Sequence, residues 1–308
     1  MTPEIIVAVT VTIMTAATPL LLAAIGELVV ERSGVLNLGV EGMMIIGAIA
    51  GFAGALSSGS AYIGILAAMI AAMALASLFA LLVLAMAANQ VATGLSITLL
   101  GLGLSGLIGQ AYIGQPGVQL PKLDVPGLSD LPIVGPLLLS HDILLYASFA
   151  ITAGVFWFLF KTRAGLILRA VGDNHSSAHA IGYPVLLVRF LAILFGGACA
   201  GLAGAYLSLS YTLQWVEGMS AGRGWIALAL VVFASWRPFR VVAGAYLFGA
   251  VLILQFHAQA AGVQIPSQFL SALPYVATIL VLILISRNRK LVQMNTPACL
   301  GQPFVADK

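Results

Sequence analysis

Residues 42–121 read GMMIIGAIAGFAGALSSGSAYIGILAAMIAAMALASLFALLVLAMAANQVATGLSITLLGLGLSGLIGQAYIGQPGVQLP and contain no Asp, Glu, Lys or Arg. A helix needs about 20 apolar residues to cross the hydrocarbon core of a bilayer. This stretch is therefore long enough for several crossings. Polar breaks at 57–60 (SSGS) and at 89–90 (NQ) divide it into three predicted spans.

The composition of the whole chain supports a membrane protein. Of its 308 residues, 61% are hydrophobic and only 7% are charged, and the mean hydropathy is +1.09. Soluble domains have about 25% charged residues. These values exclude a soluble enzyme, a secreted disulfide domain and a disordered chain. Barrel strands alternate in polarity, so the continuous apolar runs predict an all-α, polytopic helical membrane protein.

The apolar runs divide into about nine predicted spans, within a range of eight to ten. The segment 224–236 is too short to cross alone, and we expect it to be a tilted or half-inserted helix whose free end is covered by protein or by a wet cavity. The predicted spans are 5–26, 34–56, 61–87, 91–113, 143–160, 190–212, 224–236, 241–258 and 267–286.

Lys and Arg residues predict the orientation in the membrane. They gather in the 161–189 connection, in the 237–240 turn and in the tail after residue 286, and cytoplasmic segments carry an excess of these residues. We therefore expect these segments and the C-terminus in the cytoplasm, and the N-terminus outside. The sequence predicts one transmembrane domain over 1–290, with 161–189 as a cytoplasmic loop and 291–308 as a short cytoplasmic tail.

The sequence shows no residue pattern that is typical of a catalytic, nucleotide-binding or metal-binding site. The chain has no Gly-Lys pair and therefore no phosphate-binding loop. His175 and His179 are four residues apart with only Asp173 nearby, and we interpret them as two solvated loop histidines rather than metal ligands. We predict no catalytic residue, no metal and no bound cofactor. The net charge of +3 follows from the basic loops and does not indicate nucleic-acid binding.

Glu41 is the most informative charged residue in the apolar part of the chain. It lies seven residues after Gly34, and a carboxylate at membrane depth must be paired or wetted. It is either a residue of a transport pathway or gate, or a structural group that pairs with Arg32 or accepts backbone hydrogen bonds. The segment 222–224 (GRG) opens the short span, and its free amides are a second candidate for contacting a polar ligand.

The 161–189 connection contains a short predicted helix. Asp173 or Asn174 caps its start, and Gly182 ends it. A helix of about two turns is not stable alone, so it must dock on its own bundle or on a partner. Ala178, Ala180 and Ile181 are available for a partner's groove.

Four ordered motifs resemble the permease subunits of ABC importers, in the branch for simple sugars and nucleosides, which is related to ribose-type and branched-chain amino acid permeases. The motifs are ERSGVLNLGVEGMM at 31–44, ANQVATGL at 88–95, RAVGDN at 169–174 with Ala178 and Gly182, and GRGWIALA at 222–229. The family pattern often has Pro and Ala where this chain has His175 and Ser177, so details of the short helix are expected to differ.

The resemblance implies a role within a larger complex. Its partners would be a separate ATPase subunit that uses ATP and Mg, a second permease subunit (the same or a related chain), an extracytoplasmic substrate-binding protein and membrane lipid. The expected location is the bacterial inner membrane. The expected function is to form the translocation path for a nucleoside or a simple sugar. A branched-chain amino acid permease is the alternative, followed by a stand-alone secondary transporter.

The resemblance also implies roles for individual residues. Those expected to couple the chain to the ATPase are Arg169, Gly172, Asp173, Asn174, Ala178 and Gly182. Those assigned to the substrate path are Asn37, Glu41, Asn89, Gln90, Gly94 and Arg223. For Asn37, Asn89 and Gln90, helix capping or bonding between helices is the alternative role.

Overall fold

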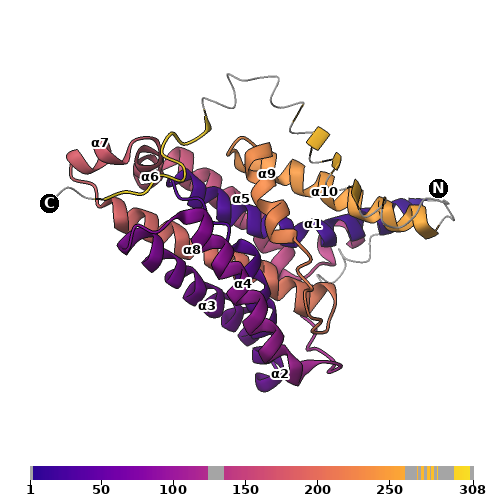
Figure 1. Cartoon of the computed structure of the whole chain (residues 1–308). Helices are drawn as coiled ribbons and strands as arrows, with labels where there is room; N and C mark the ends of the chain where they lie inside the picture. Colours follow the sequence, from indigo (N-terminus) through magenta and orange to yellow (C-terminus); the bar gives the residue numbers. More distant parts are fainter. Residues whose placement is uncertain are drawn as a thin grey trace.

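The computed structural model describes residues 3–123, 135–260 and 295–305, together with single residues and pairs between 269 and 283. All regular elements in this part of the chain are helices (Figure 1). Seven are long and apolar enough to cross a membrane. These are α1 (Pro3–Arg32), α2 (Val40–Ser58), α3 (Ala61–Ala80), α4 (Gln90–Gly109), α5 (Ile143–Lys161), α8 (Val185–Tyr206) and α10 (Pro238–Ala260).

The remaining helices are short. The helices α6 (Arg163–Asp173) and α7 (His175–Ala180) lie between α5 and α8, and α9 (Arg223–Phe233) lies between α8 and α10. Single π or 3-10 turns complete the set: η1 (Leu81–Ala85), η2 (Gln110–Tyr112), η3 (Gly135–Leu139) and η4 (Leu207–Tyr211). Three of these turns, η1, η2 and η4, directly continue α3, α4 and α8, which lengthens those helices to the limits predicted from the sequence.

The described residues contain seven long spans rather than the predicted nine. The seventh predicted span, 224–236, is α9, which has only 11 residues and cannot cross by itself. This agrees with its prediction as a half-helix. The ninth predicted span, 267–286, lies outside the described residues apart from a few isolated positions.

The first helix is longer than predicted. We expected Glu27, Glu31 and Arg32 in the connection after a span ending at residue 26, but α1 continues to Arg32. All three side chains are buried, at 1%, 1% and 6% exposure. A charged residue normally ends an apolar span, and it does not do so here because other segments of the chain supply hydrogen-bonding partners for these side chains.

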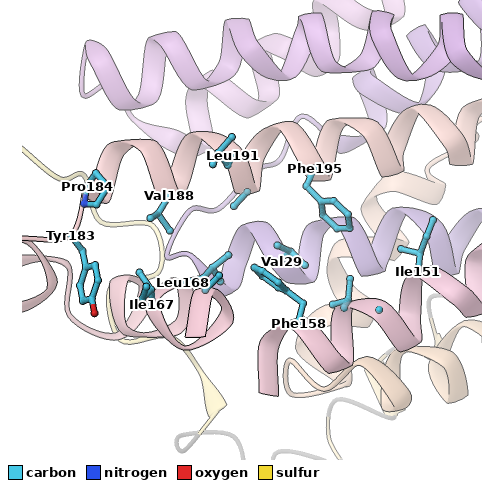
Figure 2. Close-up of a pocket in the computed structure, with 14 residues that line it drawn as sticks. Val29, Ile151, Phe158, Ile167, Leu168, Tyr183, Pro184, Val188, Leu191 and Phe195 are labelled. Atoms are coloured by element: carbon cyan, nitrogen blue, oxygen red, sulfur yellow. The ribbon is translucent and has the colours of Figure 1, made fainter. Parts of the chain in front are cut away.

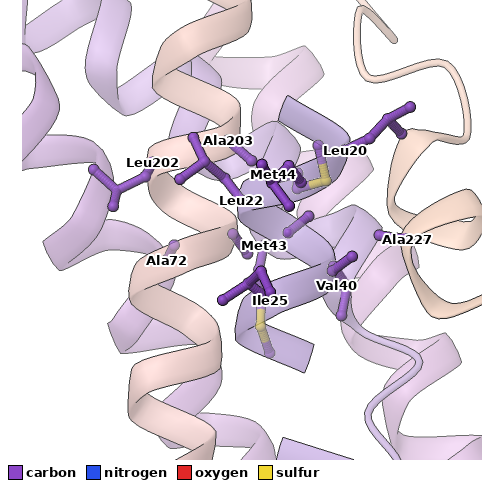
Figure 3. Packing of buried hydrophobic residues seen from close by; sticks show 14 of the residues in the cluster. Leu20, Leu22, Ile25, Val40, Met43, Met44, Ala72, Leu202, Ala203 and Ala227 are labelled. Carbon is purple, nitrogen blue, oxygen red and sulfur yellow. The ribbon is translucent and has the colours of Figure 1, made fainter. Parts of the chain in front are cut away.

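The core lies where α8 packs against α1, α2 and α3. Glycines allow the backbones to approach closely: a Cβ added at Gly47 of α2 would lie 2.7 Å from the Cα of Gly201 of α8. Around this crossing, Leu22 of α1, Met44 of α2 and Ala203 of α8 are nearly or fully buried (Figure 3). Close approach through small residues of this kind is typical of helix packing in membranes.

The short helices α6 and α7 and the C-terminal tail lie together at one end of the bundle. Figure 1 shows the tail 295–305 beside α6 and α7, with the start of α1 on the opposite side of the molecule. The end of α1, the start of α4 and the tail 295–305 meet at the same end as α6 and α7, since hydrogen bonds connect them. We call this the α7 end.

Candidate functional site

Glu41 caps the start of α9. One carboxylate oxygen accepts hydrogen bonds from the Ser220 hydroxyl at 2.6 Å and from the Gly222 amide at 2.8 Å, and the other accepts from the Gly224 amide at 2.6 Å. The side chain is 4% exposed. A carboxylate on the first amides of a helix is favourable both as a hydrogen-bond acceptor and as a charge at the positive end of the helix dipole.

This contact corresponds to one of the roles left open for Glu41. The carboxylate accepts backbone hydrogen bonds, as one of the structural alternatives had it, and the amides at 222–224 that were candidates for a polar ligand are the groups it binds. Both flanking glycines are needed here. Gly222 has φ of +79°, and a Cβ at Gly224 would lie 2.6 Å from the Cα of Glu41.

The contact lies near the middle of the bundle. Glu41 neighbours Gly42, and Gly42 packs directly against the backbone of Gly101 in α4. Gly101 is eleven residues, or about 16 Å, from the start of α4 at Gln90. This is roughly half the thickness of a bilayer core. The half-helix α9 therefore begins beside the middle of α4, and its free end is covered by protein, as an interrupted helix requires.

The other end of α9 is fixed to α1. The indole N–H of Trp236 donates to a carboxylate oxygen of Glu31 at 2.6 Å, and the guanidinium of Arg32 donates to the Trp236 carbonyl at 3.1 Å. Trp236 is 3% exposed and has φ of +54°, a conformation that side-chain-bearing residues rarely adopt. Both ends of α9 are thus held by the 31–44 segment, an arrangement we call the α9 clamp.

The other residues assigned to the substrate path from 31–44 and 88–95 also bind within the chain. Asn37 is fully buried, and its side-chain oxygen accepts from the Gly39 amide at 2.9 Å. Gln90 is 3% exposed and accepts from the Leu36 amide at 2.8 Å. These contacts hold the connecting segment 33–39 between α1 and α2.

Two more of these residues have local structural roles. Asn89 is exposed and caps α4 by accepting from the Ala92 amide at 3.0 Å. Gly94 brings α4 close to the 33–39 segment, since a Cβ there would lie 2.7 Å from the Leu38 nitrogen. The alternative role of capping and bonding between helices therefore describes the observed contacts of Asn37, Asn89 and Gln90.

Arg223 differs from the rest of this set. It follows Gly222 at the start of α9 and is only half-buried. Its guanidinium donates to the carbonyls of Met219 and Ser220 at 3.0 and 3.3 Å, and it lies over the ring of Tyr211 at 5.3 Å. A cation in the apolar part of a membrane protein is costly unless it is paired, and these carbonyls and the Tyr211 ring supply the partners of Arg223.

Sequence reasoning missed Ser220 and Trp236. Both side chains are buried and bind the carboxylates of the 31–44 segment. Neither lies at a recognisable spacing from its partner, because about 180 residues separate Ser220 from Glu41 and about 200 separate Trp236 from Glu31. The only local signal was the position of Trp236 just before the Arg237-Pro238 break.

The 161–189 connection forms two helices rather than one. Thr162 caps α6 through the Gly165 amide at 3.0 Å, and Asn174 caps α7 through the Ser177 amide at 2.9 Å. Gly182, with φ of +93°, follows the end of α7. The predicted cap at Asn174 and the predicted stop at Gly182 are therefore confirmed, and Asp173 is the last residue of α6.

The residues assigned to ATPase coupling divide into two groups. Asp173, Asn174 and Gly182 are exposed at the α7 end. Gly172 is buried, and a Cβ there would overlap the carbonyl oxygen of Arg32. Arg169 lies half-buried over the ring of Phe160 at 5.1 Å. The structure thus brings all of them to one end but presents only the first group to a partner.

The apolar residues of α7 also divide. Ala178, which we expected to be available to a partner, is 3% exposed and packs against Val171, Val185 and Phe304. That expectation was wrong, because the tail covers this face of α7. Ala180 and Ile181 remain exposed, Ile181 at 73%.

His175 and His179 contact the tail. The rings of both lie about 5 Å from the ring of Phe304, at 5.2 and 5.3 Å between centroids. The Nδ1 atom of His175 is 3.1 Å from the guanidinium of Arg189. Partial burial, and then the charge of Arg189, lower the pKa of His175 below its usual value. The imidazole is therefore held neutral, with Nδ1 as acceptor.

An apolar cavity of about 550 Å³ lies between α5, α6 and α8 (Figure 2). Phe158 of α5, Leu168 of α6 and Phe195 of α8 line it, and its mouth carries Tyr183 and Pro184. Apart from the Tyr183 hydroxyl its side chains are apolar. Sites for hydroxylated solutes need several hydrogen-bonding groups, so this cavity does not fit such a solute.

Comparison with known proteins agrees with this geometry. The family described as "Branched-chain amino acid transport system / permease component" matches residues 9–285. A permease protein of Haloferax volcanii whose name assigns it to a glucose ABC transporter is 40% identical over 94% of this chain and 94% of its own length.

Two further relatives are named for nucleosides. The guanosine ABC transporter permease protein NupQ of Bacillus subtilis is 31% identical over 95% of this chain and 94% of its own length. The nucleoside ABC transporter permease protein NupC of Lactococcus lactis is 32% identical over 87% of this chain and 89% of its own length. No solved structure matches the chain. With seven helices long enough to cross a membrane and a family match over most of its length, the chain belongs to the permease family of ABC transporters.

Proposed function

We propose that this chain is the permease subunit of an ATP-driven importer for a simple sugar or a nucleoside. The observation that carries this proposal is the similarity to permeases named for glucose, guanosine and nucleosides along almost the whole chain. Sugars and nucleosides share a hydroxylated ring, so one polar path suits both classes. The chain itself supplies the path, and a separate ATPase subunit binds ATP and Mg.

The α7 end is the proposed docking surface for the ATPase. It offers an exposed apolar side chain, Ile181, beside the exposed polar groups of Asp173 and Asn174. Such a mixture, an apolar anchor with a polar rim, is typical of protein interfaces. The basic residues of 161–189 support a cytoplasmic location for this end, and the C-terminal tail lies with it.

Arg223 is the residue we propose for the substrate path. It is half-buried at the start of α9, and its position there is fixed by the carboxylate of Glu41 on the flanking amides. Guanidinium groups donate several hydrogen bonds in a fixed geometry, which suits the hydroxyl groups of a sugar ring. A second permease subunit, the same or a related chain, would complete the path, and an extracytoplasmic binding protein would deliver the solute.

Uptake by the complete complex tests the substrate class. The complex of permease, ATPase and binding protein, purified from the native membrane and reconstituted in vesicles, is given labelled glucose, guanosine or leucine. We expect ATP-dependent uptake of glucose or guanosine and no uptake of leucine. ATP-dependent leucine uptake would favour the amino acid alternative. Uptake of any of the three without ATP would favour a stand-alone transporter.

A pair of matched variants tests the docking surface. Ile181→Asp places a charge on the exposed anchor (73%), while Ile113→Asp does the same at another highly exposed position (63%) beyond the end of α4. We expect the first variant to lose most of the copurified ATPase and the second to retain it, with both folding normally. Full retention of the ATPase by Ile181→Asp would contradict docking at α7.

A further inference from the structure

The C-terminal tail is bound to several segments that are far from it in sequence. The Gly301 amide donates to the Gly34 carbonyl at 3.1 Å, and the Cys299 amide donates to the Gly172 carbonyl at 2.9 Å. The Gln302 carbonyl accepts from Arg189 at 3.2 Å and from Gln90 at 3.4 Å. Residues 295–305 thus join the ends of α1 and α6 to the starts of α4 and α8.

Phe304 attaches the tail to α7. It is 8% exposed, and its ring lies within about 5 Å of the rings of both His175 and His179. It also belongs to a small apolar cluster with Val171 and Ala178. A helix of six residues does not form stably by itself. The position of α7 therefore depends on this cluster, and Phe304 is the largest side chain in it.

Other contacts of the tail connect it to the segment that carries the α9 clamp. The tail binds Gly34, which belongs to the 33–39 segment, and Gln90, which holds that segment by accepting from the Leu36 amide. That segment leads directly into Glu41, which caps α9. A continuous chain of hydrogen bonds and packed side chains therefore runs from α7 through the tail to the half-helix at the centre of the bundle.

We infer that the tail 295–305 positions α7 and mechanically links it to the 33–39 segment, with Phe304 as the positioning residue. The inference rests on the proposed docking of the ATPase at α7. When a partner pushes α7, the tail moves with it, and the displacement reaches the segment that holds α9. Without Phe304 the bundle still forms, but movement of α7 no longer reaches its centre.

The test compares Phe304→Ala with Val305→Ala in the reconstituted complex. Val305 is the neighbouring residue, is 70% exposed and makes a matched control. The readout is the amount of substrate taken up for each ATP hydrolysed. Coupling between distant sites corresponds to about 5- to 150-fold effects, so we expect Phe304→Ala to lower this ratio at least about fivefold. Val305→Ala keeps the wild-type ratio.

A rescue variant separates positioning from general damage. Phe304→Leu keeps an apolar side chain and is expected to restore most of the ratio, while the thermal midpoint of the bundle is the same in all three variants. A wild-type ratio in Phe304→Ala overturns the inference. If Ile181→Asp then still loses the ATPase, only the role of the tail is wrong. If Ile181→Asp keeps both the ATPase and the ratio, the proposed docking at α7 fails as well.

Discussion

Two polar segments of this chain, 31–44 and 169–182, were singled out by their motifs, and the structure uses them in opposite ways. In the first, Glu31, Arg32 and Glu41 are 1–6% exposed and bind α9 and the turn after it. In the second, Asp173 and Asn174 are exposed. The polar side chains of the first segment hold the inside of the bundle together, and Asp173 and Asn174 of the second face outward.

The physical reason for the difference is the surroundings. Inside a membrane protein no water satisfies a carboxylate, so a buried charge must find its partners in the chain. At the end of the bundle water satisfies the same groups at little cost, and they remain free for a partner protein. A matching motif therefore does not tell by itself whether its residues act within the chain or between chains.

The largest effect is expected from breaking the α9 clamp. Glu41→Ala leaves the amides of Gly222 and Gly224 and the Ser220 hydroxyl without their acceptor. Hydrogen bonds to charged groups contribute about 1.5–3 kcal/mol each, and we expect a loss of about 3–5 kcal/mol in the free energy of unfolding. Thermal unfolding of the purified protein in detergent measures it.

Glu41→Gln sharpens this test. The amide keeps one acceptor but places N–H groups against the Gly224 amide, so we expect an intermediate loss of stability. If Glu41→Gln instead unfolds like the wild type and yet blocks transport, Glu41 acts in the pathway, and the clamp is not its main role.

The second prediction compares two neighbours within the 169–182 segment. Gly172→Ala places a methyl group against the Arg32 carbonyl, and overpacking of this kind costs about 1–3 kcal/mol. Asp173→Ala changes an exposed side chain, and such changes stay within about 0.5 kcal/mol. Thermal unfolding of both variants checks the difference. Equal thermal unfolding midpoints for the two variants would contradict this prediction, because they would mean that α6 can shift away from α1 without a loss of stability.

The smallest effect is expected to be a pH dependence of the docking of α7 on the bundle. Because burial and Arg189 lower the pKa of His175, the unfolded segment binds a proton that the docked helix does not. The docking of α7 is therefore fully present above the ordinary histidine pKa of about 6.5, and it weakens as the pH falls below that value. Hydrogen exchange of the α7 amides, measured from neutral to mildly acidic pH, reports it.

The control for the pH dependence is His175→Asn. This variant removes the titrating ring next to Arg189 and Phe304 but leaves His179 in place, on the exposed side of α7. We expect the pH dependence to disappear. If it persists unchanged, His179 carries it, and the contact between His175 and Arg189 does not control the docking of α7.

Much of the architecture was predictable from the sequence. Charge-free runs located each of the seven long helices, because the length of a span is set by the bilayer and not by the fold. Local signals were equally reliable: Asn174 caps α7, Gly182 follows its end, and α9 is too short to cross. The family motifs predicted permease membership, which the comparisons confirm.

Only the tertiary structure decided what the polar residues bind. Glu41, Asn37 and Gln90 were assigned to the substrate path because sequence shows polarity and spacing but not partners. Their partners come from α9, the 33–39 segment and the tail, up to about 210 residues away. The same holds for Ala178, which Phe304 helps to cover. Helix formation in a membrane depends on local composition, whereas a buried polar group is satisfied by whichever segment the fold brings beside it.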